Sequence, residues 1–118
     1  MWSTLNLMAR ERPLIATYIM TNAPYGTLYV GVTSNLSGRV AQHKAGTFEG
    51  FTGKHGLKRL VWFEPHETML GAIRREKSLK RYLRDWKINL IERDNPHWDD
   101  LSLEWDRPPD WKHGPTDE

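Results

Sequence analysis

The stretch ATYIMTNAPYGTLYVGVTSNLSGRVAQHK, residues 16–44, decides the fold of this chain. Two short apolar runs, 15–20 and 27–32, are rich in β-branched and aromatic residues and therefore favour strands. Between them, Pro24 fixes φ and Gly26 permits a positive φ, as a tight connection requires. The pattern predicts a β-hairpin with Tyr18 on the first strand and Tyr29 on the second.

A short helix is expected directly after the hairpin. Thr33-Ser34-Asn35 offers several N-caps, and Gly46 ends a helical pattern that runs from Leu36 to Ala45. Arg39 and His43 are one turn apart and border the apolar stripe of this helix. Gly31, inside the second strand, marks a bulge, the close approach of another backbone or a ligand, or a simple packing gap beneath a helix.

A third strand and a second helix follow a glycine-containing loop at residues 46–56. Residues 57–63 have strand character, and residues 68–83 show helical periodicity. Glu76 falls in the middle of the apolar stripe of that helix, where an ionised group is costly unless a cation, a metal or several donors meet it. A pairing with Arg39 or a neighbouring lysine is the structural alternative. The expected stripe consists of Met69, Ala72, Ile73, Leu79 and Leu83.

The other face of the second helix is expected to form a basic ridge, followed by a shorter helix at residues 86–91. Asp85 is the expected cap of the shorter helix, and Trp86, Leu90 and Ile91 are expected to face the core. Trp98, Trp105 and Trp111 lie in an acidic, proline-containing tail and are expected to dock on the domain as anchors, with partner binding as the alternative. The ridge comprises Arg74, Arg75, Lys77, Lys80, Arg81 and Arg84.

Composition narrows the class of protein. The length of 118 residues suits one domain, and the absence of cysteine excludes disulfides and thiolate metal sites. Without a membrane-spanning run or a signal peptide, a soluble cytoplasmic protein with no membrane partner is expected.

Residues 1–90 carry 14 Lys/Arg against 6 Asp/Glu, whereas residues 91–118 carry 3 against 9. A basic body with an acidic tail is common in proteins that bind phosphate backbones, although such charge runs are also typical of solvated helix faces.

Taken together, these motifs make the chain similar to the GIY-YIG nuclease family, in particular to small single-domain bacterial members that resemble the excinuclease C subunit. The family's first motif is matched by Ala16-Thr17-Tyr18, which keeps only the tyrosine, and the second by Tyr29-Val30-Gly31. The family's helix arginine matches Arg39, the histidine or tyrosine one turn later matches His43, and the metal-binding glutamate matches Glu76. The resemblance covers about residues 14–100.

The resemblance implies an α+β fold, a small three-stranded antiparallel sheet flanked by helices, with the hairpin and first helix facing the glutamate helix across a shallow cleft. It also implies catalytic roles. Glu76 would hold Mg²⁺ or Mn²⁺, and Arg39 would bind the scissile phosphate. Tyr18 or Tyr29 would position the water or act as base, and His43 would relay a proton or orient a tyrosine.

Two positions depart from the family pattern. Val32 stands where some members have a lysine, and the asparagine that many members have beyond the glutamate is matched by neither Asn89 nor Asn95 clearly.

The expected activity is therefore metal-dependent endonuclease cleavage of DNA, which is favoured over RNA, in repair or processing. The alternatives are a non-catalytic nucleic-acid-binding module and a protein-interaction domain that uses the tail. The expected division is an arm at 1–13, a nuclease domain at 14–100 and an acidic tail at 101–118. The residues expected to bind nucleic acid are Lys44, Lys54, Arg74, Arg75, Lys77, Lys80 and Arg81.

Overall fold

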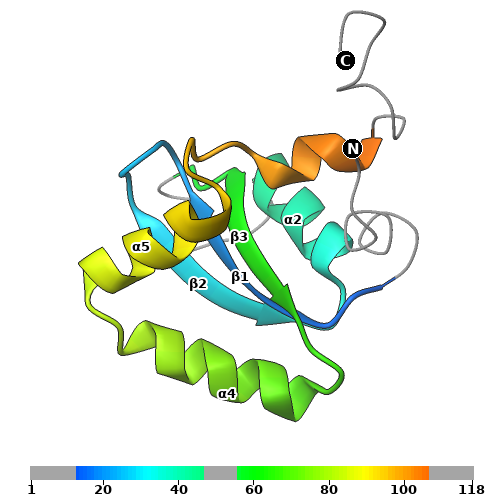
Figure 1. The fold of residues 1–118 in the computed structure, drawn as a ribbon. Helices are drawn as coiled ribbons and strands as arrows, with labels where there is room; N and C mark the ends of the chain where they lie inside the picture. Colours follow the sequence, from blue (N-terminus) through cyan, green and yellow to red (C-terminus); the bar gives the residue numbers. More distant parts are fainter. Residues whose placement is uncertain (1–12, 47–55, 107–118) are drawn as a thin grey trace, which may run out of the picture.

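The computed structural model describes residues 13–46 and 56–106, and in these ranges it shows an α+β fold. A three-stranded antiparallel sheet has the strand order β2-β1-β3 (Figure 1). The expected fold class is confirmed. The elements along the chain are β1 (Ala16–Thr21), β2 (Leu28–Thr33), α2 (Leu36–Ala45), β3 (Arg59–Pro65), α4 (Met69–Lys80), α5 (Arg84–Asp94) and the 3-10 helix η1 (Leu101–Asp106).

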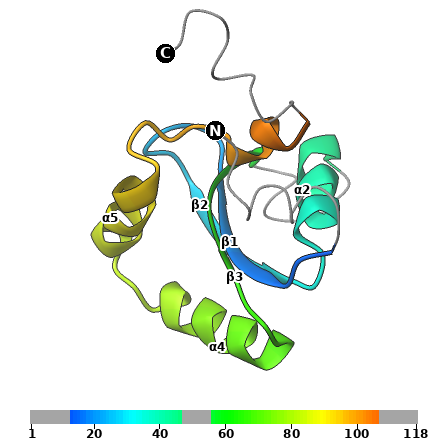
Figure 2. The ribbon, with the colours of Figure 1, turned by 45° about the vertical axis from the view of Figure 1, so that its right-hand side comes forward.

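Both faces of the sheet are covered, so the sheet is the middle layer of the domain. Turned closer to edge-on in Figure 2, the sheet lies between α2 on one side and α5 on the other, with α4 across its lower end. Because side chains alternate along a strand, β1 contributes to a separate core on each face. The core on the α2 side contains Tyr18, Met20, Leu36, Val40, Leu60 and Trp105, and the core on the α5 side contains Ile19, Val30, Trp62, Leu79, Ile91 and Trp98.

The first helix has the bounds that its sequence predicts. Asn35 is the N-cap, with its side chain accepting a hydrogen bond from the Gly38 N–H at 3.2 Å. Gly46 ends the helix with φ of 71°, a left-handed conformation that glycine adopts without strain. The predicted hairpin is likewise confirmed, with strands that begin and end one residue later than the apolar runs.

The region after Lys80 corrects three predictions. The second helix ends at Lys80 rather than continuing to Leu83, which is the extended N-cap residue of α5 and is 63% exposed. Asp85 therefore lies in the first turn of α5 and is not its cap. Trp86, expected to face the core, is 53% exposed because it lies five residues before the buried Ile91, about 140° away around α5. Ile91 is buried, as expected.

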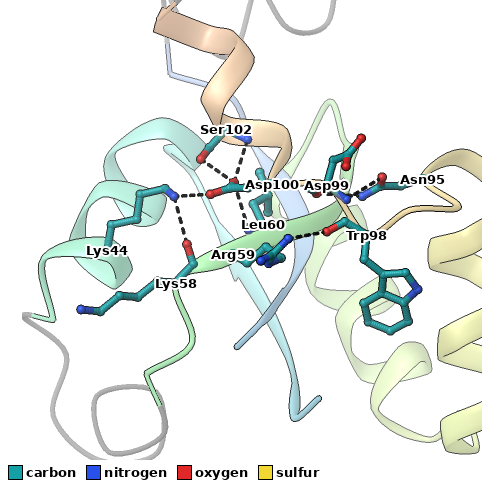
Figure 3. A network of polar contacts seen from close by, with 9 residues as sticks. All are labelled: Lys44, Lys58, Arg59, Leu60, Asn95, Trp98, Asp99, Asp100 and Ser102. Carbon is teal, nitrogen blue, oxygen red and sulfur yellow. Dashed lines mark hydrogen bonds and ion pairs between the residues drawn. The ribbon is translucent and has the colours of Figure 1, made fainter. Parts of the chain in front are cut away.

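The tryptophans at residues 98 and 105 anchor the chain after α5, as predicted. Trp98 is 1% exposed and Trp105 is 5% exposed, and the Trp105 ring meets Phe63 edge-on with 6.2 Å between centroids. Trp111 lies outside the described residues. The chain reaches η1 through a polar network, shown in Figure 3, in which one Asp100 oxygen accepts hydrogen bonds from Leu60 N, Ser102 N and Ser102 Oγ.

Asn95 belongs to the same network and has a structural role. Its Nδ2 donates to the carbonyls of Val61 at 3.1 Å and Asp99 at 2.9 Å, and its Oδ1 accepts from the Asp99 N–H at 3.0 Å. The side chain is buried, and these bonds tie the end of α5 to β3. By contrast, Asn89 is exposed on α5.

Replacing Asn95 with alanine is expected to destabilise the protein by about 1–3 kcal/mol, because the buried carbonyl of Val61 and the partly buried backbone groups of Asp99 lose their partners. The matched variant Asn89→Ala removes an exposed amide from the same helix and should change stability by less than about 0.5 kcal/mol. Urea unfolding followed by circular dichroism measures both. Equal effects of the two substitutions would contradict the structural role of Asn95.

Candidate active site

The site begins where the first tyrosine crosses the neighbouring strand. Tyr18 in β1 pairs with Gly31 in the edge strand β2, and the Tyr18 ring lies over that glycine. A Cβ atom at position 31 would lie 2.5 Å from Tyr18 Cζ and 2.5 Å from its hydroxyl oxygen. The group that lies close to Gly31 is therefore a side chain, and not the backbone or ligand that the sequence suggested. The irregularity in strand pairing occurs instead between β1 and β3, at Ile19 and Met20.

Helix α2 places His43 against the end of this tyrosine. The Tyr18 hydroxyl and His43 Nε2 are 2.9 Å apart, and His43 is 4% exposed. Leu36 and Val40, two turns and one turn before His43, are buried on the sheet and fix the side of the helix that His43 presents. This hydrogen bond joins the centre of the sheet to the helix that covers it.

Tyr29 completes a cluster of three aromatic rings. Its ring centroid lies 6.3 Å from that of Tyr18 and 5.6 Å from that of His43, while the Tyr18 and His43 centroids are 5.6 Å apart. Tyr29 is half-buried, whereas Tyr18 is fully buried. The two tyrosines, either of which is predicted to position the water or act as base, are thus close to each other, and Tyr29 is the one with access to solvent.

The electrostatic environment fixes the protonation of Tyr18 and His43 near neutral pH. Burial, assisted by Tyr29 and Glu76, raises the pKa of Tyr18 well above its ordinary value, although the charge and hydrogen bonding of Arg39 oppose the shift. Burial and the positive charge of Arg39 lower the pKa of His43 to about 4. Tyr18 is therefore a neutral phenol and His43 a neutral imidazole, with one ring nitrogen able to accept a proton.

Glu76 lies on α4, which packs against β1 and β2, and its charge contributes to the raised pKa of Tyr18. Thr17 Oγ1 donates to the Ala72 carbonyl at 2.8 Å and fastens the helix to β1. The Glu76 side chain is 16% exposed, and its Oε2 lies 2.8 Å from Lys80 Nζ. The interior placement predicted from periodicity is confirmed, and the carboxylate is paired with a neighbouring lysine, as the structural alternative anticipated.

A divalent cation fits this donor set only if it keeps most of its own water. Among the described residues, no group of three or more His, Asp or Glu side chains converges on one point. One carboxylate with retained waters and phosphate oxygens is a common way to bind Mg²⁺. Lys80 is 54% exposed and can turn aside to release the Glu76 carboxylate.

The predicted nucleic-acid-binding residues fall into two groups. Arg74, Lys77 and Arg81 are exposed, whereas other basic side chains make contacts within the protein. Arg75 donates a hydrogen bond to Glu64 at 3.0 Å and lies over the Trp62 ring. Its side chain is therefore not part of the exposed basic ridge.

The remaining basic residues also differ from the pattern that the sequence indicated. Lys44 pairs with Asp100 and donates to the Lys58 carbonyl at 3.0 Å (Figure 3). Lys80 holds Glu76, an i,i+4 spacing that the sequence already displayed. Lys54 lies outside the described residues. The binding roles of all these residues stay predictions.

Comparison with known proteins agrees with this geometry. The sequence model of the GIY-YIG catalytic domain matches residues 14–89. The chain belongs to the GIY-YIG family. UPF0213 proteins from Staphylococcus aureus strains Mu3, Mu50 and N315 are each 34% identical to it over 67 residues, which is 57% of this chain and 82% of theirs. No solved structure matches the chain significantly.

Membership in the GIY-YIG family supports nuclease chemistry and a nucleic-acid substrate. The matched range includes all five predicted catalytic residues, and the fold brings four of them, from β1, β2 and α2, around one point, with the charge of Glu76 acting on Tyr18 from α4. Within residues 13–46 and 56–106, no helix is long and apolar enough to cross a membrane.

Replacing Gly31 with alanine is expected to destabilise the protein by about 1–3 kcal/mol, because the new methyl group overlaps the Tyr18 ring. The cost should fall when Tyr18→Ala is present as well, since the obstructing ring is gone. A double-mutant cycle of urea unfolding measures this coupling. An unchanged cost of Gly31→Ala in the Tyr18→Ala background would contradict the assigned contact.

The depressed pKa of His43 predicts a pH-dependent contribution to stability. An unfolded histidine has a pKa of about 6.5, so protonation favours the unfolded chain. Neutral His43 contributes fully to the free energy of unfolding above pH 6.5, and this contribution is lost as the pH falls from there towards about 4. Urea midpoints of the wild type and His43→Gln, measured across this range, should converge on acidification. A constant difference would contradict a depressed pKa.

Proposed function

We propose that this GIY-YIG protein is a divalent-metal-dependent endonuclease that hydrolyses phosphodiester bonds, with DNA as its substrate. One observation carries the proposal: Tyr18, Tyr29 and His43 form a single cluster within the electrostatic reach of both Arg39 and Glu76. Such a cluster combines a proton acceptor, phosphate donors and a carboxylate. Metal-assisted phosphodiester hydrolysis uses a proton acceptor, donors to the phosphate and a ligand for the cation.

Glu76 is the residue that would hold Mg²⁺ or Mn²⁺, and the bound cation would offset negative charge on the phosphate and the leaving oxygen. Arg39, half-buried on α2, donates to phosphate oxygens from the other side. The ion pair with Lys80 orients the Glu76 carboxylate before substrate arrives. Negative charge on Glu76 and positive charge on Arg39 thus lie on separate elements that both reach Tyr18.

The aromatic cluster handles the proton of the attacking water. Tyr29, the more accessible tyrosine, orients the water through its hydroxyl group. Tyr18 stays protonated because burial raises its pKa, so its role is to hold His43 in place. Neutral His43 provides the nitrogen that accepts a proton as the water oxygen bonds to phosphorus and the bond to the leaving oxygen breaks. Solvent returns a proton to the leaving oxygen.

Cleavage assays test this function. Purified protein is incubated with supercoiled, single-stranded and branched DNA in the presence of Mg²⁺ or Mn²⁺. Glu76→Gln and Arg39→Ala should each lower the rate about 100-fold or more, since each removes a group that stabilises charge in the transition state. The matched variant Glu67→Gln, which changes an exposed carboxylate just before α4, should retain the wild-type rate.

Equal melting temperatures of the four proteins would show that lost activity reflects chemistry and not unfolding. Cleavage by Glu76→Gln at the wild-type rate, or cleavage that persists in EDTA, would contradict the proposed site.

The ion pair between Glu76 and Lys80 favours one second candidate, a nucleic-acid-binding module without catalysis, because it occupies the carboxylate that a metal would need. This function predicts salt-sensitive binding of DNA and no cleavage with any divalent cation. Arg81→Ala should then weaken binding, while Glu76→Gln should leave binding unchanged.

A further inference from the structure

An exposed apolar surface lies at the junction between α4 and α5. Leu83 is 63% exposed and Trp86 is 53% exposed, and half-buried Tyr82 meets the Trp86 ring edge-on with 5.5 Å between centroids and 83° between planes. Tyr82, Leu83 and Trp86 are called the Trp86 platform below. Because Tyr82 supports one side of the indole, the platform holds a large aromatic ring in a fixed, solvent-facing position.

Positive charge surrounds the platform. Residues 77–87 contain five basic side chains and one acidic side chain, Asp85. In the part of the chain that the structure describes, Lys77, Arg81, Arg84 and Lys87 make no ion pair with a carboxylate. Arg84 donates to the carbonyls of Tyr25 at 2.7 Å and Gly26 at 2.8 Å, which fix its position but leave its charge uncompensated.

This combination fits nucleic acid better than another protein surface. A second copy of the chain would bring the same cations face to face, which opposes self-association. Phosphates complement the cations, and every base has a face that can stack on an aromatic ring. A duplex hides those faces between its own base pairs, so the platform suits a segment whose bases are unpaired.

The position of the platform along the chain links it to the candidate active site. Glu76 and Lys80 are four positions apart on α4, a rise of about 6 Å, and the platform begins two residues after α4 ends at Lys80. A strand bound here would therefore run along the same helix that carries the candidate metal ligand.

We propose that the Trp86 platform and its surrounding cations bind single-stranded nucleic acid, with an unpaired base stacked on the Trp86 indole. The inference rests on the proposed function, because it names the form of substrate that the same protein selects. Single-stranded DNA and single-stranded RNA share the required chemistry, and the experiment separates them.

Binding in EDTA tests the inference without requiring cleavage. Fluorescence anisotropy measures the affinity of the full chain for labelled oligo-dT, oligo-U and duplex DNA, each of roughly 15 nucleotides or base pairs. Trp86→Ala should weaken single-strand binding about 5- to 150-fold, the equivalent of about 1–3 kcal/mol for one stacked base. Trp86→Phe should retain most of the affinity because it keeps an aromatic face.

Two further variants distinguish the effect of base stacking on binding from the effects of exposed apolar area and of positive charge. Leu103→Ala removes a 52% exposed apolar side chain from η1 and should leave binding unchanged. Arg81→Ala should weaken single-strand and duplex binding alike and make both less dependent on salt. A stronger loss with oligo-dT or with oligo-U identifies which single strand the platform takes.

Equal binding of single strands by the wild type and Trp86→Ala would overturn the inference. So would an equal loss of single-strand and duplex binding in Trp86→Ala, or a dimer in sedimentation that Trp86→Ala dissolves. Failure of the proposed function appears separately, as wild-type protein that binds these oligonucleotides in EDTA but cleaves no substrate when Mg²⁺ or Mn²⁺ is added.

Discussion

The candidate active site depends on one contact. The Tyr18 ring lies across Gly31, and its hydroxyl group reaches the His43 imidazole. The contact requires a tyrosine on the central strand, a residue without a Cβ on the edge strand and a histidine late in the covering helix. Each requirement comes from a different element, so the sheet and α2 have to be in place before the contact forms. Once formed, it buries two polar rings together and gives the buried phenol a hydrogen-bond partner.

Local sequence patterns predicted the parts of the structure that local physics determines. Asn35 and Gly46 bound α2 because capping and left-handed backbone are properties of a few adjacent residues. The interior position of Glu76 followed from helical periodicity. The nature of its partner did not follow, since Arg39 and a lysine one turn away were equally plausible until the fold placed them.

The failures of prediction occur where packing overrides periodicity. A continuous helix to Leu83 would have kept Leu83 on the buried stripe, but the chain breaks after Lys80 so that α5 can pack on the sheet through Ile91. With Ile91 on the sheet, Trp86 lies about 140° away around α5 and faces outward. Likewise, the basic residues of α4 looked alike in sequence, yet Arg75 alone lies close enough to Trp62 and Glu64 to turn inward. Such differences depend on neighbours distant in the chain.

The complete burial of β1 has a consequence for how this protein tolerates sequence change. All six residues from Ala16 to Thr21 are buried, because one face meets α2 and the other meets α4 and α5. An edge strand such as β2, by contrast, includes half-buried positions. Random substitution should therefore be harmful at every position of β1, without the alternation typical of a strand that faces water on one side. Sequence variation compatible with folding is then concentrated on the outer strands and on the exposed faces of the helices.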